Sequence, residues 1–341
     1  MNLPAHTEVL IVGAGPIGLS VAISARRRAI EPLVIDAGAL VNSIAGYPPG
    51  MNFFTTSERL EIGGHPLSST GTRPTREEAL SYYRGVVRAE GIDVRPWVRL
   101  VGATRNGAGF EAALATRHGH TTIGCDRLVL ATGYFDHPNL LDVPGESLPH
   151  VSHKFDEPHL CAGQDVVIMG GKNSAIEAAL LAFRAGGRVT LVHRGDQLKS
   201  SVKYWLRPDF ENRVKAGEIA ARFGTTVLRI TTRDVVTAGP DGQHSIPADR
   251  VYLLTGYHPD FELLRSLGVE LDPVTGRALV GENLESSVPG LHLAGSVAAG
   301  RMISEVFIEN GRYDGEKIFG GIEGVRHADR LYADSPRPVG E

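Results

Sequence analysis

The sequence predicts an α/β fold with two Rossmann-like dinucleotide-binding domains, and three observations support this prediction. A glycine loop, Gly13-Ala14-Gly15-Pro16-Ile17-Gly18, lies between an apolar run at 9–12 and a segment with helical apolar spacing at 16–26. A similar order recurs at 166–192, with a second glycine turn at 170–175. Apolar runs that end in Thr-Gly occur twice, at 128–133 and at 251–256. Because strand, glycine loop and helix in this order are typical of dinucleotide binding, the repeat indicates two such domains.

The composition is that of an ordinary globular protein with two domains. The 341 residues carry a formal net charge of -4, which argues against nucleic acid or an anionic membrane as a partner. No apolar run reaches the roughly 20 residues of a membrane helix. The first strand is expected by Val9, so we expect no signal peptide. With only Cys125 and Cys161, a disulfide framework is excluded and a cytoplasmic location is expected.

The residue that ends the second strand of each domain indicates which dinucleotide binds. Asp36 follows the apolar run 33–35, and a carboxylate there accepts hydrogen bonds from ribose hydroxyls and repels a 2′-phosphate. His193 and Arg194 hold the equivalent place in the second copy, with Lys199 just beyond. Cations suit the 2′-phosphate of NADPH. Since a nicotinamide and a flavin are the usual pair, we assign FAD to the first site and NADPH to the second.

Basic residues near the second site have two interpretations. Lys199, Lys203 and Arg207 recur every four residues, which on a helix gives one basic stripe. The stripe could meet the 2′-phosphate or an acidic substrate, or it could be a solvated helix face. Lys172 could lie near the NADPH pyrophosphate or face solvent in its turn.

The order of motifs predicts a discontinuous first domain. We expect the FAD domain at 1–152 and 259–324, the NADPH domain at 153–258 and a flexible tail at 325–341. A helix is expected at about 302–319, with its N-terminus near Gly300 facing the flavin. Another helix is expected at 75–90, stopped by Gly91, followed by β-hairpins at 92–125. His150, His153 and His159 lie on a proline-bearing connector, so no metal site is expected.

The chain resembles the bacillithiol disulfide reductase (YpdA-like) family of thioredoxin-reductase-like flavoproteins, over residues 8–320. The strings that carry this resemblance are Asn42-Ser43-Ile44 with Tyr47-Pro48, Phe53-Phe54-Thr55-Thr56-Ser57, Leu60-Glu61-Ile62-Gly63, Tyr82-Tyr83-Arg84, Ala131-Thr132-Gly133-Tyr134, Gly170-Gly171-Lys172-Asn173-Ser174-Ala175, Thr255-Gly256-Tyr257 and Ile308-Glu309-Asn310-Gly311. The resemblance implies an FAD enzyme that takes hydride from NADPH and reduces a low-molecular-weight disulfide such as bacillithiol disulfide. It also implies a homodimer or homotetramer.

Motifs and resemblance together give two sets of candidate cofactor-binding residues. For FAD these are Gly13, Gly15, Pro16, Ile17, Asp36, Ala37, Asn42, Ser43, Tyr47, Phe54, Val98, Ala131, Thr132, Gly133, Gly295, Ser296 and Gly300. For NADPH they are Gly170, Gly171, Lys172, Asn173, Ser174, His193, Arg194, Lys199, Lys203, Gly256 and Tyr257.

One residue departs from the family in a way that bears on its chemistry. Typical members carry a cysteine in the first glycine loop where this chain has Ile17. We expect Cys125 and Cys161 to be buried structural thiols. The electron acceptor is therefore either a small disulfide, or a small electron-carrier protein or quinone that needs no protein thiol. A flavoprotein redox sensor is the non-enzymatic alternative.

Overall fold

The computed structural model describes residues 3–302 and 305–333, which divide into two compact units. The first contains the described residues up to Ala45, Gly50–His137 and the described residues from Tyr257 onward; the second contains Gly46–Pro49 and Pro138–Gly256. The second unit begins before the expected residue 153, because β7 (Val151–Ser152) pairs with β14 (Arg250–Leu253) in its sheet. The chain returns to the first unit at Tyr257 rather than at residue 259.

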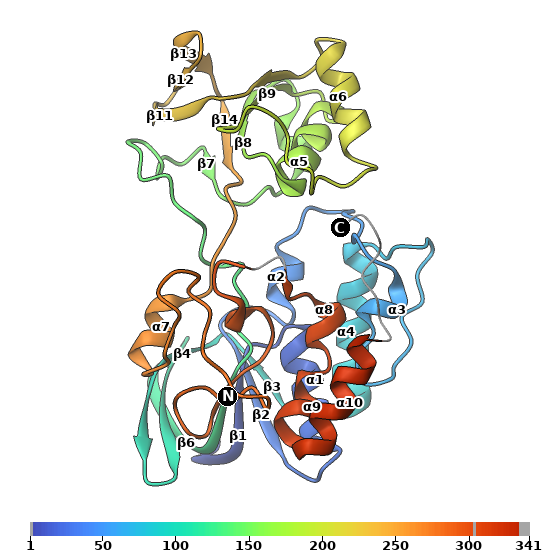
Figure 1. Ribbon diagram of the computed structural model, residues 1–341, viewed down its shortest axis with the longest axis vertical. Coiled ribbons are helices and arrows are strands. Elements are labelled where there is room, and N and C mark those ends of the chain that lie inside the picture. The colour runs from blue at the N-terminus through green and yellow to red at the C-terminus, as the bar shows by residue number, and fades with distance from the viewer. Residues whose placement is uncertain (1–2, 303–304, 334–341) are drawn as a thin grey trace. The chain divides into compact units, whose positions relative to one another are not determined.

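The first unit is built on one mixed sheet of seven strands in the order β3-β2-β1-β6-β5-β4, with β15 beside β6 (Figure 1). The strands are β1 (His6–Val12), β2 (Pro32–Asp36), β3 (Val94–Pro96), β4 (Val98–Asn106), β5 (Gly109–Thr116), β6 (Gly119–Leu130) and β15 (Leu291–Leu293). Strands β1, β2, β3 and β15 run parallel to their neighbours, whereas β4, β5 and β6 form the expected antiparallel hairpins. The carboxyl ends of β1, β2 and β6 therefore meet at one edge, next to the first glycine loop.

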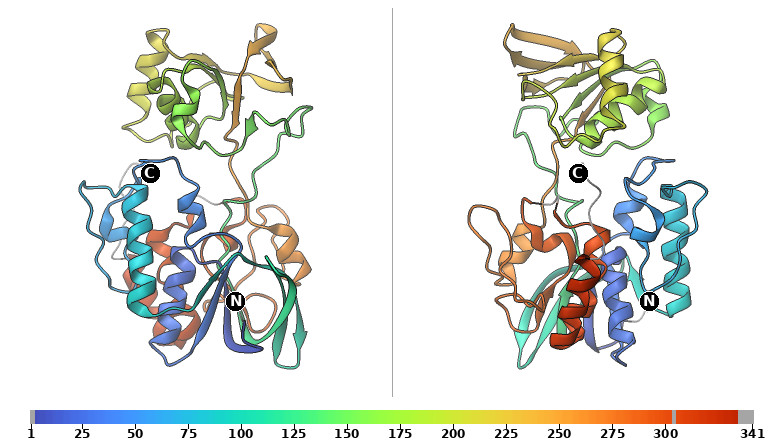
Figure 2. Two further views of the ribbon diagram at one scale, coloured as in Figure 1. Left: turned by 180° about the vertical axis from the view of Figure 1, so that it is seen from behind. Right: turned by 45° about the vertical axis from the view of Figure 1, so that its right-hand side comes forward.

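Helices cover this sheet, and the views in Figure 2 show α1, α4, α9 and α10 gathered together. The helices of the unit are α1 (Pro16–Arg26), α2 (Asn42–Ala45), α3 (Ser57–Leu60), α4 (Arg76–Glu90), α7 (Phe261–Ser266), α8 (Ile308–Gly311), α9 (Asp314–Phe319) and α10 (Gly321–Ala333), with the 3-10 helix η2 (Gly295–Ala299). Helix α4 begins as predicted, because Thr75 and Glu78 form a capping box, and Gly91 ends it in the left-handed conformation.

Two predictions about the C-terminal region are wrong. The helix expected at 302–319 is broken into the short helices α8 and α9, and residues 303–304 lie outside the described part. The expected flexible tail from residue 325 is helical through α10, and 334–341 are not described. Gly324 and Ala328 are buried one turn apart, and Lys317 pairs with Asp329 at 2.5 Å, so small residues and an ion pair attach α10 to α9.

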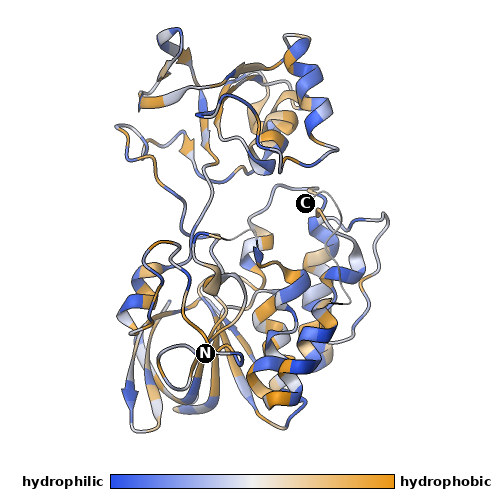
Figure 3. Ribbon diagram, viewed as in Figure 1, coloured by the Kyte–Doolittle hydropathy of each residue, from blue (hydrophilic) through white to orange (hydrophobic). Residues whose placement is uncertain are grey.

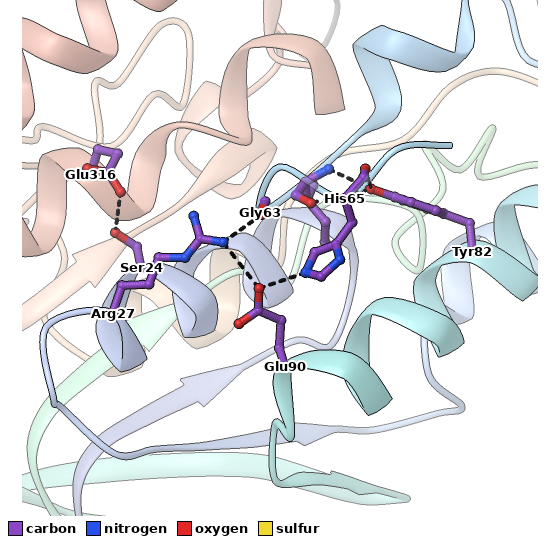
Figure 4. Close-up of polar contacts among 8 residues, drawn as sticks. Ser24, Arg27, Gly63, His65, Tyr82, Glu90 and Glu316 are labelled. Carbon is purple, nitrogen blue, oxygen red and sulfur yellow. Dashed lines mark hydrogen bonds and ion pairs between the residues drawn. The ribbon is translucent and has the colours of Figure 1, made fainter. Parts of the chain in front are cut away.

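A polar network ties the 61–65 loop to the helices around it (Figure 4). The guanidinium of Arg27, the residue that caps the end of α1, donates to the carbonyl of Gly63 at 2.5 Å and to Glu90 of α4 at 3.2 Å. His65 lies 2.7 Å from the same Glu90 carboxylate, and the Tyr82 hydroxyl donates to the carbonyl of His65. The loop is therefore fixed against α1, the helix that begins at the glycine loop.

The second unit contains a parallel five-stranded sheet in the order β10-β9-β8-β14-β7 and a separate antiparallel sheet of β11, β12 and β13. Its other elements are η1 (Pro158–Cys161), β8 (Asp165–Met169), α5 (Asn173–Arg184), β9 (Arg188–Val192), α6 (Arg207–Lys215), β10 (Ala220–Arg222), β11 (Thr226–Ile230), β12 (Asp234–Gly239) and β13 (Gly242–Pro247). Hydrophobic residues follow α5 and the strands beside it, whereas α6 is largely hydrophilic (Figure 3). The core of this unit thus lies between α5 and the parallel sheet.

The basic stripe expected at 199–207 does not form. Helix α6 begins only at Arg207, where Pro208 suits the first turn, so Lys199 and Lys203 lie in the preceding loop. The Arg207 guanidinium turns back and donates to the carbonyls of Leu198 and Lys199.

The two units repeat one arrangement of strand, glycine loop and helix. In the first, Gly13 N–H donates to Ile35 of β2, and Ala131 N–H donates to Val12 of β1. In the second, Gly170 N–H donates to Val192 of β9, and Leu254 N–H donates to Met169 of β8. The fold predicted from the repeat of motifs is therefore confirmed at the level of individual backbone hydrogen bonds.

Candidate functional site

The first glycine loop contains glycines of two kinds. A Cβ added at Gly13 would overlap the carbonyl oxygen of Ala131, and one added at Gly18 would overlap the carbonyl oxygen of Gly13. These two glycines are required by contacts within the protein. A Cβ at Gly15, in contrast, would meet nothing within 4 Å. The space over Gly15 is thus free for a group that the chain itself does not supply.

The start of α1 faces this open space with unused backbone donors. Gly15 is the N-cap residue, it provides no side-chain cap, and the first turn holds no acidic residue. This contrasts with α4, whose first turn is closed by Thr75 and Glu78. This helix N-terminus is uncapped, and the space where a Cβ of Gly15 would lie is empty. Such a place suits a pyrophosphate, because both the N–H groups and the helix dipole attract anions.

Asp36 lies at the side of the same loop. One oxygen of its carboxylate accepts from Ala14 N–H and the other from Gly38 N–H, each at 2.7 Å. Burial raises the pKa of Asp36, while these two backbone bonds oppose the rise. Each oxygen retains a lone pair for the hydroxyl groups of a ribose. Loop, helix and carboxylate together fit the adenosine diphosphate half of FAD.

Further candidate FAD residues gather at the end of β6. Thr132 has a buried Oγ1 without a hydrogen-bond partner among the described residues. Gly133 is left-handed, and a Cβ there would lie 3.8 Å from the hydroxyl oxygen of Ser296. A buried hydroxyl group without a hydrogen-bond partner is uncommon in protein interiors, so this one is consistent with a polar ligand at this position.

The side chain of Ile17 is packed between two glycines from the C-terminal region. Its Cδ1 atom would be 2.5 Å from a Cβ at Gly295 and equally 2.5 Å from one at Gly311. The buried carboxylate of Asp314 accepts from Gly295 N–H at 2.7 Å, and burial raises its pKa to about 7. Ile17 therefore fills a close-packed contact that joins α1, η2 and α8.

Neither cysteine is placed to act as a nucleophile. Cys125 is 1% exposed within β6 and Cys161 is fully buried in η1. Burial raises the pKa of Cys125 to about 12, and it also raises the pKa of Cys161. Because the thiolate is the reactive form, both thiols are structural at neutral pH, which agrees with the prediction.

The second glycine loop leads into α5, which also lacks a side-chain cap and an acidic residue in its first turn. Gly170 packs against the carbonyl oxygen of Leu254, as Gly13 does against Ala131. Asn173 accepts a hydrogen bond from Lys203 N–H at 2.9 Å. The loop that carries Lys199 and Lys203 is thereby held against the start of α5, so these candidate NADPH residues lie together.

His193 does not provide the exposed cation that the sequence suggested. Its ring is 7% exposed and lies so close to Gly171 that a Cβ there would overlap it. Burial first, and then the charges of Lys199 and Arg194, lower its pKa. Arg194, Lys199 and Lys172 are exposed instead, and none has a side-chain ion pair among the residues described. These three residues contribute available positive charge at this edge.

Glu177 was missed by sequence reasoning. It lies in α5, is partly buried, and forms no hydrogen bond or ion pair within the described chain. Burial raises its pKa to about 7. The sequence did contain one sign of this residue, an acidic side chain among alanines soon after a glycine turn. Helical spacing alone, however, does not tell whether such a side chain is buried or exposed.

The remaining candidates are dispersed. Tyr257 lies in the first unit, with its ring near Tyr134 and Phe135, rather than with the NADPH candidates of the second unit. Gly300 packs against the backbone at 275–277, which explains this glycine without a cofactor, and it does not begin a helix. The other candidates lie as follows: Pro16 in α1; Ala37 after β2; Asn42 and Ser43 in α2; Tyr47 and Phe54 in the 46–56 loops; Val98 in β4; Ser174 in α5; and Gly256 after β14.

The described part of the chain contains neither a cluster of metal-ligating side chains nor a membrane-spanning helix. No group of three His, Cys, Asp or Glu side chains could hold a metal ion within 3–302 and 305–333. No helix in this part of the chain is long and apolar enough to cross a membrane.

Comparison with known proteins identifies relatives over nearly the whole chain. The model of the pyridine nucleotide-disulphide oxidoreductase family matches residues 10–295. Bacilliredoxin reductase Bdr of Bacillus subtilis (strain 168) is 43% identical over 313 residues, which cover 91% of this chain and 96% of that protein. The solved structure of bacillithiol disulfide reductase Bdr (YpdA) from Bacillus cereus superposes with a TM-score of 0.90 at 38% identity, covering 96% of this chain and 99% of the other.

The fold extends to a more distant enzyme. A thioredoxin reductase of T. acidophilum has a TM-score of 0.72 at 22% identity, over 97% of this chain and 99% of the other. The thioredoxin-reductase-like fold predicted from the motif order is thus confirmed. The chain belongs to the pyridine nucleotide-disulphide oxidoreductase family, and it is an FAD- and NADPH-dependent flavoprotein oxidoreductase.

Proposed function

We propose that this flavoprotein uses NADPH to reduce a low-molecular-weight disulfide of the bacillithiol type. The observation that carries the proposal is the similarity to the bacilliredoxin and bacillithiol disulfide reductases along almost the full length of both chains. In the balanced reaction, NADPH, one proton and one disulfide give NADP⁺ and two thiols. Bound FAD supplies the two-electron chemistry that links the nicotinamide to the disulfide.

The first unit is the FAD domain in this proposal. The free donors at the start of α1 would bind the pyrophosphate, and Asp36 would accept from the ribose hydroxyls. The hydroxyl of Thr132 would meet its missing partner on the cofactor. These assignments follow from the open position over Gly15, which no side chain of the described unit fills.

The second unit is the NADPH domain. The start of α5 would bind the pyrophosphate, and the exposed cations Arg194 and Lys199 would bind the 2′-phosphate. His193 would orient the loop from beneath Gly171 as a neutral ring rather than bind phosphate directly. A cytoplasmic location and a homodimer or homotetramer are also part of the proposal, by analogy with the family.

The burial of both thiols bears on how the disulfide is reduced. With Ile17 in the glycine loop, and with Cys125 and Cys161 inaccessible, the described chain offers no thiolate to form a mixed disulfide. The substrate disulfide would have to receive its electrons without a protein thiol as intermediate. The same observation keeps a thiol-free acceptor, a small electron-carrier protein or a quinone, as the second candidate.

Anaerobic reoxidation kinetics test the proposal directly. The NADPH-reduced enzyme is mixed with bacillithiol disulfide, with ferredoxin or with a quinone, and flavin absorbance is followed. Rapid reoxidation by the disulfide alone, with two thiols formed per NADPH, is expected. The Cys125→Ser, Cys161→Ser double variant should react at the same rate. Reoxidation by ferredoxin or quinone but not by the disulfide would overturn the substrate assignment.

A further inference from the structure

Trp97 is an exposed tryptophan held in a strained backbone conformation. It lies between β3 and β4, its side chain is 53% exposed, and its φ is 62°. The left-handed region is costly for a bulky residue and persists where the surrounding structure enforces it. Within the described chain the indole makes no hydrogen bond and no ring contact. Core packing therefore does not explain why this side chain is held here.

The backbone places Trp97 beside the acid of the first nucleotide site. Trp97 N–H donates to the carbonyl of Gly38 at 3.1 Å, and the preceding Pro96 is in register with Asp36 across β2 and β3. Gly38 in turn donates its own N–H to the Asp36 carboxylate. A short chain of backbone contacts thus joins the tryptophan to the carboxylate proposed to bind ribose.

The charge of a second side chain near the start of β4 also acts on the carboxylate. Arg99 is exposed two residues after Trp97, and its charge acts on Asp36, where it opposes the rise in pKa that burial causes. The intervening Val98 is 3% exposed and belongs to the core. The exposed positions at the start of β4 therefore lie at the nucleotide-facing edge of the sheet.

The chemistry of an aromatic side chain at this point identifies the group it would contact. A ribose bound to Asp36 carries its base on the adjacent carbon, within reach of neighbouring side chains. Stacking between a base and an aromatic side chain contributes substantially to affinity for nucleotides. We propose that Trp97 is the platform for the adenine ring of FAD, with its left-handed backbone setting the direction of the indole.

This role makes Trp97 a determinant of specificity for the dinucleotide over the mononucleotide. FMN lacks adenine and would gain nothing from the indole. The inference rests on the proposal that FAD occupies the first unit, and the test separates the two statements by including Gly15→Ala. That substitution places a methyl group in the open space over the glycine loop without touching the adenine platform.

The experiment measures flavin affinity of the flavin-free full-length chain, prepared from the holoenzyme. Trp97→Gly is the main variant, because glycine accepts φ of 62° without strain while it removes the indole. The dissociation constant for FAD should rise about 5- to 150-fold, and that for FMN should not change. Trp97→Phe should stay within about threefold of wild type, since phenylalanine also stacks. Val101→Ala, at another exposed position of β4, should have no effect.

AMP provides a second measurement that does not depend on flavin. It carries adenine, ribose and one phosphate but no flavin, so it should compete with FAD for the wild-type chain and compete more weakly for Trp97→Gly. If Trp97→Gly lost FAD and FMN affinity equally, the role of Trp97 would be structural. If its FAD affinity were unchanged, Trp97 would not contact the cofactor. Either result overturns the proposal that Trp97 stacks on adenine. If Gly15→Ala also leaves FAD affinity unchanged, the assignment of FAD to the first unit fails as well.

Discussion

Substitutions at the two kinds of glycine in the first loop should have different effects on folding and on cofactor binding. At Gly15, an added methyl group meets nothing within 4 Å, and the backbone angles, φ -74° and ψ 174°, are ordinary for alanine. At Gly18, the same methyl group would overlap the carbonyl oxygen of Gly13. We therefore expect Gly15→Ala to fold normally and to lose FAD, and Gly18→Ala to lose both stability and FAD.

The sizes of these effects follow from the contacts. Overpacking in a close-packed site costs about 1–3 kcal/mol, and Gly18→Ala should fall at the upper end because the overlapped atom belongs to the backbone. For Gly15→Ala the free energy of unfolding of the flavin-free chain should change by less than about 1 kcal/mol. Loss of two hydrogen bonds to a charged phosphate, at about 1.5–3 kcal/mol each, would weaken FAD binding roughly 10²- to 10⁴-fold.

Urea unfolding of the flavin-free chain and FAD titration by flavin fluorescence measure the two quantities separately. Gly107→Ala is a matched control for the handling of a glycine variant, because its Cβ position is also open but lies in the β4–β5 turn. Its left-handed φ of 62° should cost some stability and leave the FAD affinity unchanged. If Gly15→Ala bound FAD as tightly as wild type, the pyrophosphate would not lie against this loop.

Two further predictions concern charge. Arg194→Ala and Lys199→Ala should each raise the KM for NADPH about 10- to 100-fold and that for NADH less than about twofold, with Lys215→Ala of α6 as the neutral control; equal effects on both coenzymes would refute the phosphate role. The folded-state pKa of Asp314, about 7 against an ordinary 3.8, means that the folded chain holds a proton there that the unfolded chain releases. Stability should therefore fall as pH rises from about 4 to 7, by up to about 4 kcal/mol. Asp314→Asn, which keeps an acceptor for Gly295 N–H, should lose this component in urea unfolding at pH 5 and pH 8; an unchanged pH dependence would contradict it.

Features that depend on neighbours in sequence could be predicted well. The glycine loop, Asp36 and the hairpins at 92–125 are defined by residues within a few positions of one another. The capped helix α4 is of the same kind, because Thr75, Glu78 and Gly91 carry its ends. For these elements the local chemistry is sufficient, since a cap, a turn or an alternation acts over only a few residues.

Features that depend on packing across the sheet could not be predicted. His193 is at a strand end like Asp36, but the imidazole ring of His193 is buried because Gly171 lies close to it. No sequence pattern predicts this close contact. The break between α8 and α9 and the helical state of residues 325–333 depend on contacts with α1 and between α9 and α10. Trp97 and Glu177 became candidates only when their exposure, burial and missing partners could be seen.

The duplicated backbone explains why one fold can bind two different dinucleotides. Gly13 and Gly170 make corresponding hydrogen bonds and corresponding close contacts, so the same geometry would hold a pyrophosphate in both units under the proposed assignment. What differs is the side chain at the end of the second strand: a carboxylate in one unit, and a buried neutral imidazole followed by free cations in the other. Under the proposed assignment, discrimination between the coenzymes would depend on the charge at the edge of the sheet.

The same reasoning limits how electrons can leave the flavin. The Ile17 side chain packs between Gly295 and Gly311. An isoleucine side chain cannot take part in thiol–disulfide exchange. A relay thiol at this position would have to replace the isoleucine, and Cys125 and Cys161 are too deeply buried to substitute for it. If a disulfide is the acceptor, specificity and reactivity must come from how the substrate itself is positioned, because the protein contributes no thiolate of its own.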